Sequence, residues 1–168
     1  GGQSGRAFLT STEVRCELAF VVVGLGLFDL LFRLVAIRAL GRTPPGRIPH
    51  HSGAWLRREL RVDLLEGAGR LLSGTMFWPV WLRAAGMRIG DGSEVSSIHE
   101  CVPDEVAIGA GCFFADGVYL GAPRHEPGHA VCAGARLGAA TFVGNHAVLP
   151  GGTNLPDEML IGISTPAP

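Results

Sequence analysis

Residues 137 to 162, "LGAATFVGNHAVLPGGTNLPDEMLIG", carry an aliphatic residue at every sixth position. Each is followed by glycine or proline, and the five are Leu137, Val143, Leu149, Leu155 and Ile161. The residue two positions before each aliphatic residue is mostly small. Alternate residues of a strand share a face, so each hexamer predicts a short strand whose small and aliphatic residues both turn inward. Proline cannot take a positive φ, so the glycines at its position are expected for their lack of bulk.

A strict period of six with a corner in each repeat is typical of a parallel β-helix in which three hexamers form one triangular coil. The sequence therefore predicts a mainly β fold, a left-handed parallel β-helix of hexapeptide repeats over residues 87–168, truncated at its C-terminal end. The period also runs upstream, through Ile89, Val95, Ile108, Phe114 and Leu120.

Two segments break the period and are expected to leave the regular coil. Residues 96–107 make the interval from Val95 to Ile108 one residue longer than two hexamers. Residues 121–136 make the interval from Leu120 to Leu137 one residue shorter than three hexamers. The second segment contains "RHEPGH", with His125, Glu126 and His129. Histidine exchanges protons near neutral pH, as a general base for acyl transfer must. His125 is therefore the candidate catalytic residue, with Glu126 or His129 to orient its ring; the alternative is an exposed polar loop.

The composition indicates contact with lipid and argues against nucleic acid. Of the 168 residues 47% are hydrophobic and 17% charged, which is apolar for a domain of this size. The net charge is −1, and the 14 basic residues, all arginine, form no stripe. The four cysteines include no CxxC pair and are expected to be reduced packing residues. The first residue is glycine, and we expect a piece of a longer protein.

Four segments are expected along the chain: an N-terminal flank (1–15), a transmembrane helix (16–42), a linker with an amphipathic, interfacial helix (43–86), and the β-helix (87–168). The apolar run at 16–40 has about the twenty residues that a span needs. Asp29 and Arg33 lie four apart and can pair on one face. The alternatives are a buried helix of a soluble domain and, less fitting, a cleaved signal peptide. Arginines are denser after the run than before it, which places the β-helix in the cytoplasm.

Residues 43–52, "TPPGRIPHHS", read as a linker with Ser52 as a helix N-cap. The helix that follows has leucines at roughly helical spacing and leads into "TMFWPVWLRAAG", with Trp78 and Trp81. This pattern suits a membrane interface, or equally a helix buried against the end of the next domain. Farther along, Phe142 and Leu160 lie 18 residues apart and predict an apolar stripe. We expect it to be buried against another β-helix or against residues 53–72, with the His125 loop near that seam.

The stretches "LLSGTMFWPVWLRAAG", "GMRIGDGSEV", "DEVAIGAGCFF" and "RLGAATFVGNHAVLPGGTNLPDEMLIGISTPAP" resemble the C-terminal membrane region of epsilon-poly-lysine synthetase-like nonribosomal peptide synthetases. That family alternates transmembrane helices with tandem domains of the left-handed β-helix acyltransferase type. The resemblance implies that an amino acid held as a thioester on a pantetheine arm is joined to a free amine. It also implies that His125 is the histidine of the interrupted coil. Before "VAIG" the chain reads "VPDE", where only Asp104 fits the family pattern.

Three functions follow from these observations. The first is a membrane-tethered acyltransferase domain of a peptide synthetase, which uses a carrier-bound aminoacyl or peptidyl thioester and an amine acceptor. The second is a stand-alone hexapeptide N- or O-acetyltransferase that uses acyl-CoA. The third is a non-catalytic copy of such a domain. Further β-helix copies, in cis or as a homotrimer, are the expected protein partners.

A zinc site is the remaining alternative, because the sequence holds His99, His125, His129 and His146. The histidines are scattered, and such histidines are usually not ligands, so we expect no metal. The sequence has no GxSxG motif, P-loop or dinucleotide fingerprint.

Overall fold

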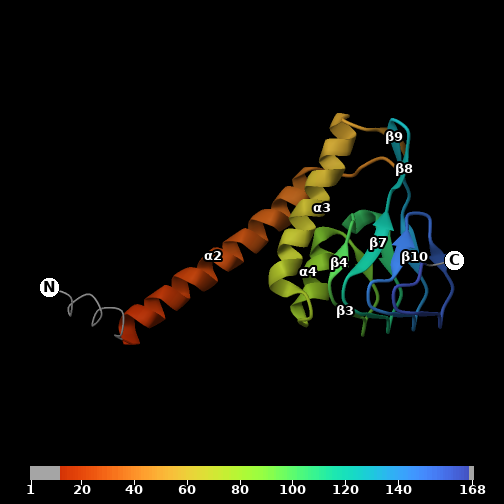
Figure 1. Cartoon of the computed structure of the whole chain (residues 1–168). Helices are drawn as coiled ribbons and strands as arrows, with labels where there is room; N and C mark the ends of the chain where they lie inside the picture. The colour runs from red at the N-terminus through yellow and green to blue at the C-terminus, as the bar shows by residue number, and fades with distance from the viewer. Residues whose placement is uncertain (1–11, 167–168) are drawn as a thin grey trace. The chain divides into compact units, whose positions relative to one another are not determined.

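The computed structural model describes residues 12–166, as helices and short strands (Figure 1). The helices are α2 (Thr12–Ala39), α3 (Gly53–Leu72), α4 (Phe77–Ala85) and the 3-10 helix η1 (Pro103–Glu105). The strands are β1 (Gly46–Pro49), β2 (Arg88–Ile89), β3 (Glu94–Val95), β4 (Ile98–His99), β5 (Val106–Ile108), β6 (Phe113–Phe114), β7 (Val118–Ala122), β8 (Arg124–Glu126), β9 (His129–Cys132), β10 (Ala135–Leu137), β11 (Phe142–Val143), β12 (Val148–Pro150), β13 (Asn154–Leu155) and β14 (Leu160–Ile161).

The chain divides into two compact units, Gly1–Phe32 and Arg33–Pro168. In the first, the described residues belong to α2, whose apolar side chains are mostly exposed. The stretch Val14–Ala39 has 26 residues and is long and apolar enough to span a membrane. The end of α2 belongs to the second unit, where Ile37 is buried and the Arg38 Nε donates to the Ala84 carbonyl at 2.8 Å.

Three parallel sheets form the body of the second unit, and consecutive strands belong to different sheets. Their strand orders are β13-β10-β5-β2, β14-β11-β6-β3 and β12-β7-β4. Helix α4 packs against β2 and β3, and α3 packs against β4. Strands β1, β9 and β8 form a separate antiparallel sheet.

The expected fold class, mainly β with a left-handed parallel β-helix, is wrong for this chain. The described residues form a mixture of helices and separate short strands, in parallel and antiparallel sheets, and no left-handed β-helix is indicated. The physical reason is that the period of six describes only local structure. A repeat of six records that a short strand with an inward aliphatic recurs, but it does not report the hand of the connections. Nor does it report the helices and the hairpin that complete the core.

The local expectations for the repeat residues are confirmed. The five aliphatics from Leu137 to Ile161 are at most 6% exposed. Leu137 pairs with Leu155 and Val143 with Ile161, so equivalent residues stack 18 positions apart. Burying one such side chain contributes about 1.5–3 kcal/mol.

The corners show why glycine recurs after the aliphatic residue. A Cβ added to Gly138 would lie 2.4 Å from the Asp157 nitrogen, and the φ of Gly138 is not in the left-handed region. Bulk therefore excludes other residues there, as expected. The left-handed backbone occurs two positions later, at Ala140 and Glu158, with φ of 54° and 60°. The sequence pattern gave no sign of this strain, because these positions are not confined to glycine.

The segment 121–136 is an insertion rather than a shortened turn of the repeat. Leu149 pairs with Leu120 in one sheet, while Leu137 pairs with Ile108 in another. Among the parallel strands, β10 with Leu137 therefore follows β7 with Leu120 directly, so the interval corresponds to one hexamer rather than three and carries about eleven extra residues. These residues form most of the hairpin of β8 and β9.

Helix α3 turns a different face inward than its leucines predicted. Its buried residues include Arg58, Arg61 and Leu65, whereas Leu56 and Leu60 are exposed. Ser52 caps the helix as expected, since its Oγ accepts from the Trp55 nitrogen at 3.2 Å. In α4 the tryptophans are buried, and the exposed apolar side chains are Met76, Phe77 and Val80. The alternative in which this helix is buried against the next domain thus holds for Trp78 and Trp81.

We expect Leu149→Ala to lower the free energy of unfolding by about 2–5 kcal/mol, because the side chain is fully buried and its removal leaves a cavity. Chemical denaturation followed by circular dichroism measures this. Leu160→Ala is the matched control, since that leucine is 75% exposed, and it should change stability little. Equal losses in the two variants would contradict the inward placement of Leu149.

Candidate functional site

His125 lies on the three-stranded antiparallel sheet that stands apart from the parallel sheets. Strand β9 pairs with both β1 and β8, and the register aligns Ile48, Ala130 and His125 in one row. Ile48 and Ala130 are buried, and Ala54 and Trp55 of α3 pack against them. Residues paired across neighbouring strands turn their side chains to the same face of a sheet, so His125 points to the same inner face as Ile48 and Ala130.

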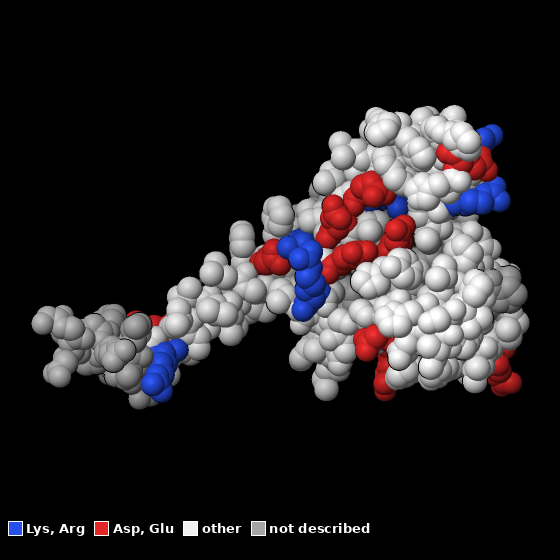
Figure 2. Space-filling model, viewed as in Figure 1, with Lys and Arg blue, Asp and Glu red and all other residues white. Residues whose placement is uncertain are grey.

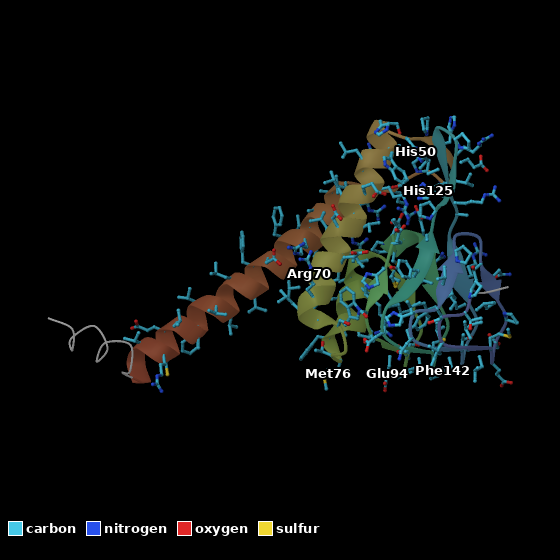
Figure 3. The ribbon with its side chains drawn as sticks, in the orientation of Figure 1. His50, Arg70, Met76, Glu94, His125 and Phe142 are labelled. Carbon is cyan, nitrogen blue, oxygen red and sulfur yellow. The ribbon has the colours of Figure 1, made fainter. Side chains whose placement is uncertain are left out.

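Two aromatic rings, those of His50 and Trp55, lie beside the His125 ring. The centroid of the His125 ring lies 5.6 Å from that of His50 and 5.8 Å from that of Trp55. The His50 and Trp55 centroids are 5.3 Å apart. The Nδ1 of His125 lies 3.4 Å from the Nε2 of His50, so one nitrogen donates and the other accepts. Figure 3 shows His50 and His125 at the same end of the unit.

The ring of His50 is held by the local backbone. His50 follows β1, and its backbone N–H donates to the Gly128 carbonyl in the hairpin turn at 3.0 Å. Trp55 is placed by the first turn of α3, which Ser52 caps. Sequence reasoning missed His50 because "TPPGRIPHHS" reads as a linker, and it missed Trp55 because no local pattern joins the start of the next helix to the His125 segment. The alternation of Ile48 and His50 around Pro49 was the available sign of a strand.

Glu126 and His129 face away from the His125 ring. The Glu126 carboxylate accepts from Arg47 at 2.6 Å and from Arg124 at 2.9 Å, on the outer face of the sheet. His129 Nδ1 lies 3.4 Å from the Pro127 carbonyl oxygen. Glu126 therefore holds two arginines and His129 contacts the hairpin turn, whereas the polar group beside the His125 ring is His50.

The geometry at His125 suits proton transfer. With Nδ1 engaged by His50, the Nε2 is the nitrogen left to face a bound molecule, and the side chain is exposed. The aromatic neighbours fix the ring orientation by packing. The arrangement therefore offers an exposed, oriented imidazole without a carboxylate partner.

A second polar cluster joins α3 to the segment before β5. The guanidinium of Arg61 donates to Asp104, and Arg58 donates to the Glu100 carbonyl at 3.0 Å. Arg58 and Arg61 are 1% and 3% exposed. Asp104, the residue that fits the family pattern, is thus an anchor between η1 and α3. Sequence reasoning missed the two arginines because they interrupt an apolar pattern, although they share helical spacing with Leu65.

Burial shifts the acid–base behaviour of this cluster. It raises the pKa of Glu105, and the nearby Arg58 opposes that shift. It also raises the pKa of the Cys101 thiol, which is therefore not a nucleophile. Cys101, Cys112 and Cys132 are buried and free, as expected of packing residues, and Cys16 is exposed and free.

The other histidines lie at separate places. The His99 ring lies 5.5 Å from that of Tyr119, and its Nδ1 lies 3.5 Å from Glu66. His146 stands against Gly117 at a corner. The described residues bring no three histidines, cysteines or carboxylates together as a metal site would require. The absence of a metal stays a prediction.

The chain is similar to Delta-poly-L-ornithine synthetase of Acinetobacter baumannii (strain AB307-0294), with 32% identity over 133 residues. The match covers 77% of this chain but only 10% of that protein. No family model and no solved structure matches. The similarity is to a poly-amino-acid synthetase, which is the broad class that the resemblance indicated, and it does not show membership of the hexapeptide-repeat superfamily.

We expect Glu105→Gln to stabilise the protein at neutral pH. A carboxyl group whose pKa is raised on folding binds its proton more tightly in the folded state, so its contribution to stability falls as pH rises above its ordinary value of 4.5. The free energy of unfolding of the variant should exceed that of the parent at pH 7 and approach it near pH 4. Denaturant titrations at both values test this, with Glu158→Gln as an exposed control; parallel pH profiles would contradict it.

Proposed function

We propose that this chain is an acyltransferase domain of a poly-amino-acid synthetase, in which His125 acts as the general base. The observation that carries the proposal is the exposed His125 ring, held between His50 and Trp55. The similarity to a poly-ornithine synthetase supports the substrate class, a basic amino acid joined through an amine.

The reaction is aminolysis of a thioester. The amine nitrogen attacks the carbonyl carbon of an aminoacyl or peptidyl thioester, and His125 Nε2 takes the proton that the nitrogen loses. A C–N bond forms, the C–S bond breaks, and the sulfur leaves as the thiol of the pantetheine arm once it has received that proton. For Nε2 to carry the lone pair, His125 Nδ1 carries the hydrogen and donates to His50 Nε2, 3.4 Å away, and this contact keeps Nε2 directed outward.

Two alternatives use the same residues. A stand-alone N- or O-acetyltransferase would take the acyl group from acyl-CoA, with His125 in the same role. A non-catalytic copy would keep the hairpin only as structure. The similarity to a synthetase favours the carrier-bound thioester over acyl-CoA.

The partners are proposed on the same grounds. Phe142 and Leu160 form the outer stripe of the sheet that contains β11 and β14, and they are 43% and 75% exposed. They are therefore not buried against α3, and a further copy of this domain, in cis or in a homotrimer, is the proposed cover. The stripe and His125 lie at opposite ends of the unit, so the expectation of one shared seam is wrong (Figure 3).

The proposed location is a membrane, with the second unit on the cytoplasmic side. The length and apolar composition of α2 support the span. The exposed Met76, Phe77 and Val80, and the exposed leucines of α3, give the second unit apolar surface suited to the interface.

We expect His125→Ala to lower the rate of thioester aminolysis by about 10²–10⁴-fold, the range for loss of a general base. The assay follows free thiol release from an aminoacyl-pantetheine thioester with an ornithine amide as the amine. Glu126→Gln is the control on the outer face and should retain activity, while His50→Gln should give an intermediate rate. Full activity in His125→Ala would contradict the role of His125 as general base, and no activity in the parent chain would favour the non-catalytic alternative.

We expect the chain to stay in the membrane pellet after extraction with alkaline carbonate, because about twenty apolar residues cross the bilayer. Cysteines introduced beyond residue 43 should react with an impermeant reagent only after the cells are opened. Release of the chain by carbonate would contradict the span, and labelling of intact cells would contradict the orientation.

A further inference from the structure

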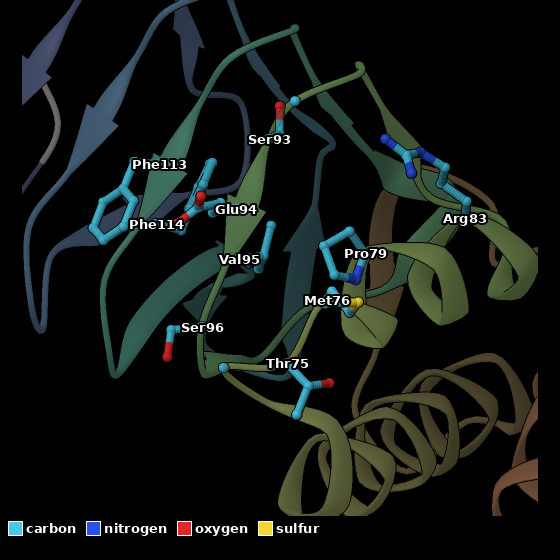
Figure 4. Close-up of a pocket in the computed structure, with 12 residues that line it drawn as sticks. Thr75, Met76, Pro79, Arg83, Ser93, Glu94, Val95, Ser96, Phe113 and Phe114 are labelled. Carbon is cyan, nitrogen blue, oxygen red and sulfur yellow. The ribbon is translucent and has the colours of Figure 1, made fainter.

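A groove of about 530 Å³ crosses β3, at the end of the unit away from His125. Its walls come from the α3–α4 turn, with Met76 and Pro79, and from the strands, with Glu94 and Phe113. Figure 4 shows the first pair on one side of β3 and the second pair on the other. Strand β3 pairs only with β6 among the described strands, so it forms the edge of its sheet.

The hydroxyl groups of the groove present hydrogen-bond acceptors. Thr75 Oγ1 donates to the Leu72 carbonyl at 2.7 Å, and Ser93 Oγ donates to the Gly109 carbonyl at 2.8 Å. Ser96 Oγ donates to Asp116. A hydroxyl has one hydrogen, so the Thr75 and Ser96 oxygens have only lone pairs left for a ligand, whereas the buried Ser93 Oγ already accepts from the Cys112 N–H at 3.1 Å.

The groove's one guanidinium is directed at the protein. Arg83 Nε donates to the Ile89 carbonyl and Nη2 to the Gly90 carbonyl, each at 2.9 Å. Nη2 also lies 3.7 Å from Asp91, which offsets its charge. The Nε and Nη2 of Arg83 are therefore engaged by the segment around β2, and no ion pair joins Arg83 to Glu94 within residues 12–166.

The Glu94 carboxylate has no hydrogen bond or ion pair within residues 12–166, and the residue is exposed. The register places Glu94, Phe113 and Phe142 side by side in three successive strands. The Phe113 and Phe142 rings stack with their centroids 5.2 Å apart, so the other face of Phe113 turns toward Glu94. A cation is attracted both to a carboxylate and to the face of an aromatic ring, so this pair suits a bound cation.

The charge of the neighbouring surface agrees with this. Figure 3 places Met76, Glu94 and Phe142 along the lower edge of the unit. In the same view, Figure 2 shows acidic side chains along this lower edge, and no basic side chain of the described residues is visible there. The groove and its rim thus offer negative charge, acceptors and apolar walls, but few free donors.

We propose that this groove binds a primary ammonium group on an extended, flexible chain, such as the side chain of a basic peptide, with the ammonium between Glu94 and Phe113. An ammonium has three donors and no acceptor, which matches a wall of lone pairs. The methylene stem would lie against Met76 and Pro79. The choice of a basic peptide as ligand rests on the proposed function, whereas the ammonium chemistry rests on the groove alone.

The test measures binding of tri-L-ornithine to the full chain in detergent by calorimetry at low salt. We expect Glu94→Gln to weaken the affinity about tenfold or more, the loss expected when a charge-assisted contact is removed. Glu158→Gln, an exposed carboxylate at a corner beside β14 on the far edge of the sheet, is the matched control and should bind like the parent. The same peptide with its side-chain amines acetylated should not bind.

Unchanged affinity in Glu94→Gln, equal binding of the acetylated peptide, or no binding by the parent would each overturn the proposal. The outcome is separable from that of the proposed function, because binding requires no acyl transfer. The variant His125→Ala should still bind tri-L-ornithine as the parent does. If transfer proceeds while the peptide does not bind the groove, the groove inference alone fails.

Discussion

The close stacking of backbone on backbone at the glycine corners is the constraint on which the second unit depends. A Cβ on Gly90 would meet Ala110, one on Gly109 would meet Ala139, and one on Gly138 would meet Asp157, each within 2.6 Å. These corners form a column in which every turn of the chain lies directly against the next. Only at this separation can Leu137 and Leu155 pair in register and exclude water from the interior. The helices, the hairpin and the groove are all attached to the frame that this column sets.

How far the sequence predicts this structure depends on whether the determining contact is local. The burial of Leu149 follows from the spacing of neighbours, and the role of Gly138 follows from its exchange with proline. Arg58 does not follow, because its burial depends on a carbonyl 42 residues away, at Glu100. The same holds for the candidate site. His125 was found because its segment leaves the period, but His50 lies 75 residues earlier, and no local pattern joins the two rings.

The buried arginines show how the helices are fixed to the sheets. Removing a guanidinium from water is costly unless it is paired, and both Arg58 and Arg61 meet acceptors in the segment between β4 and β5. The arginines therefore bind the segment 96–107, which contains one residue more than two hexamers need. Its irregularity makes Glu100 adopt a φ of 59°, with its N–H bound by Glu66 at 3.1 Å. An interruption of the repeat therefore serves as the attachment point of α3.

The two proposed sites differ in what they offer a ligand, and they lie at opposite ends of the second unit (Figure 3). The hairpin provides an exposed imidazole beside a second histidine ring, and the groove provides a carboxylate beside an aromatic ring. A single small amine can occupy only one of them at a time. Under the two proposals, a ligand that carries several amines and reaches both sites gains binding energy at each, whereas a ligand with one amine gains it at only one.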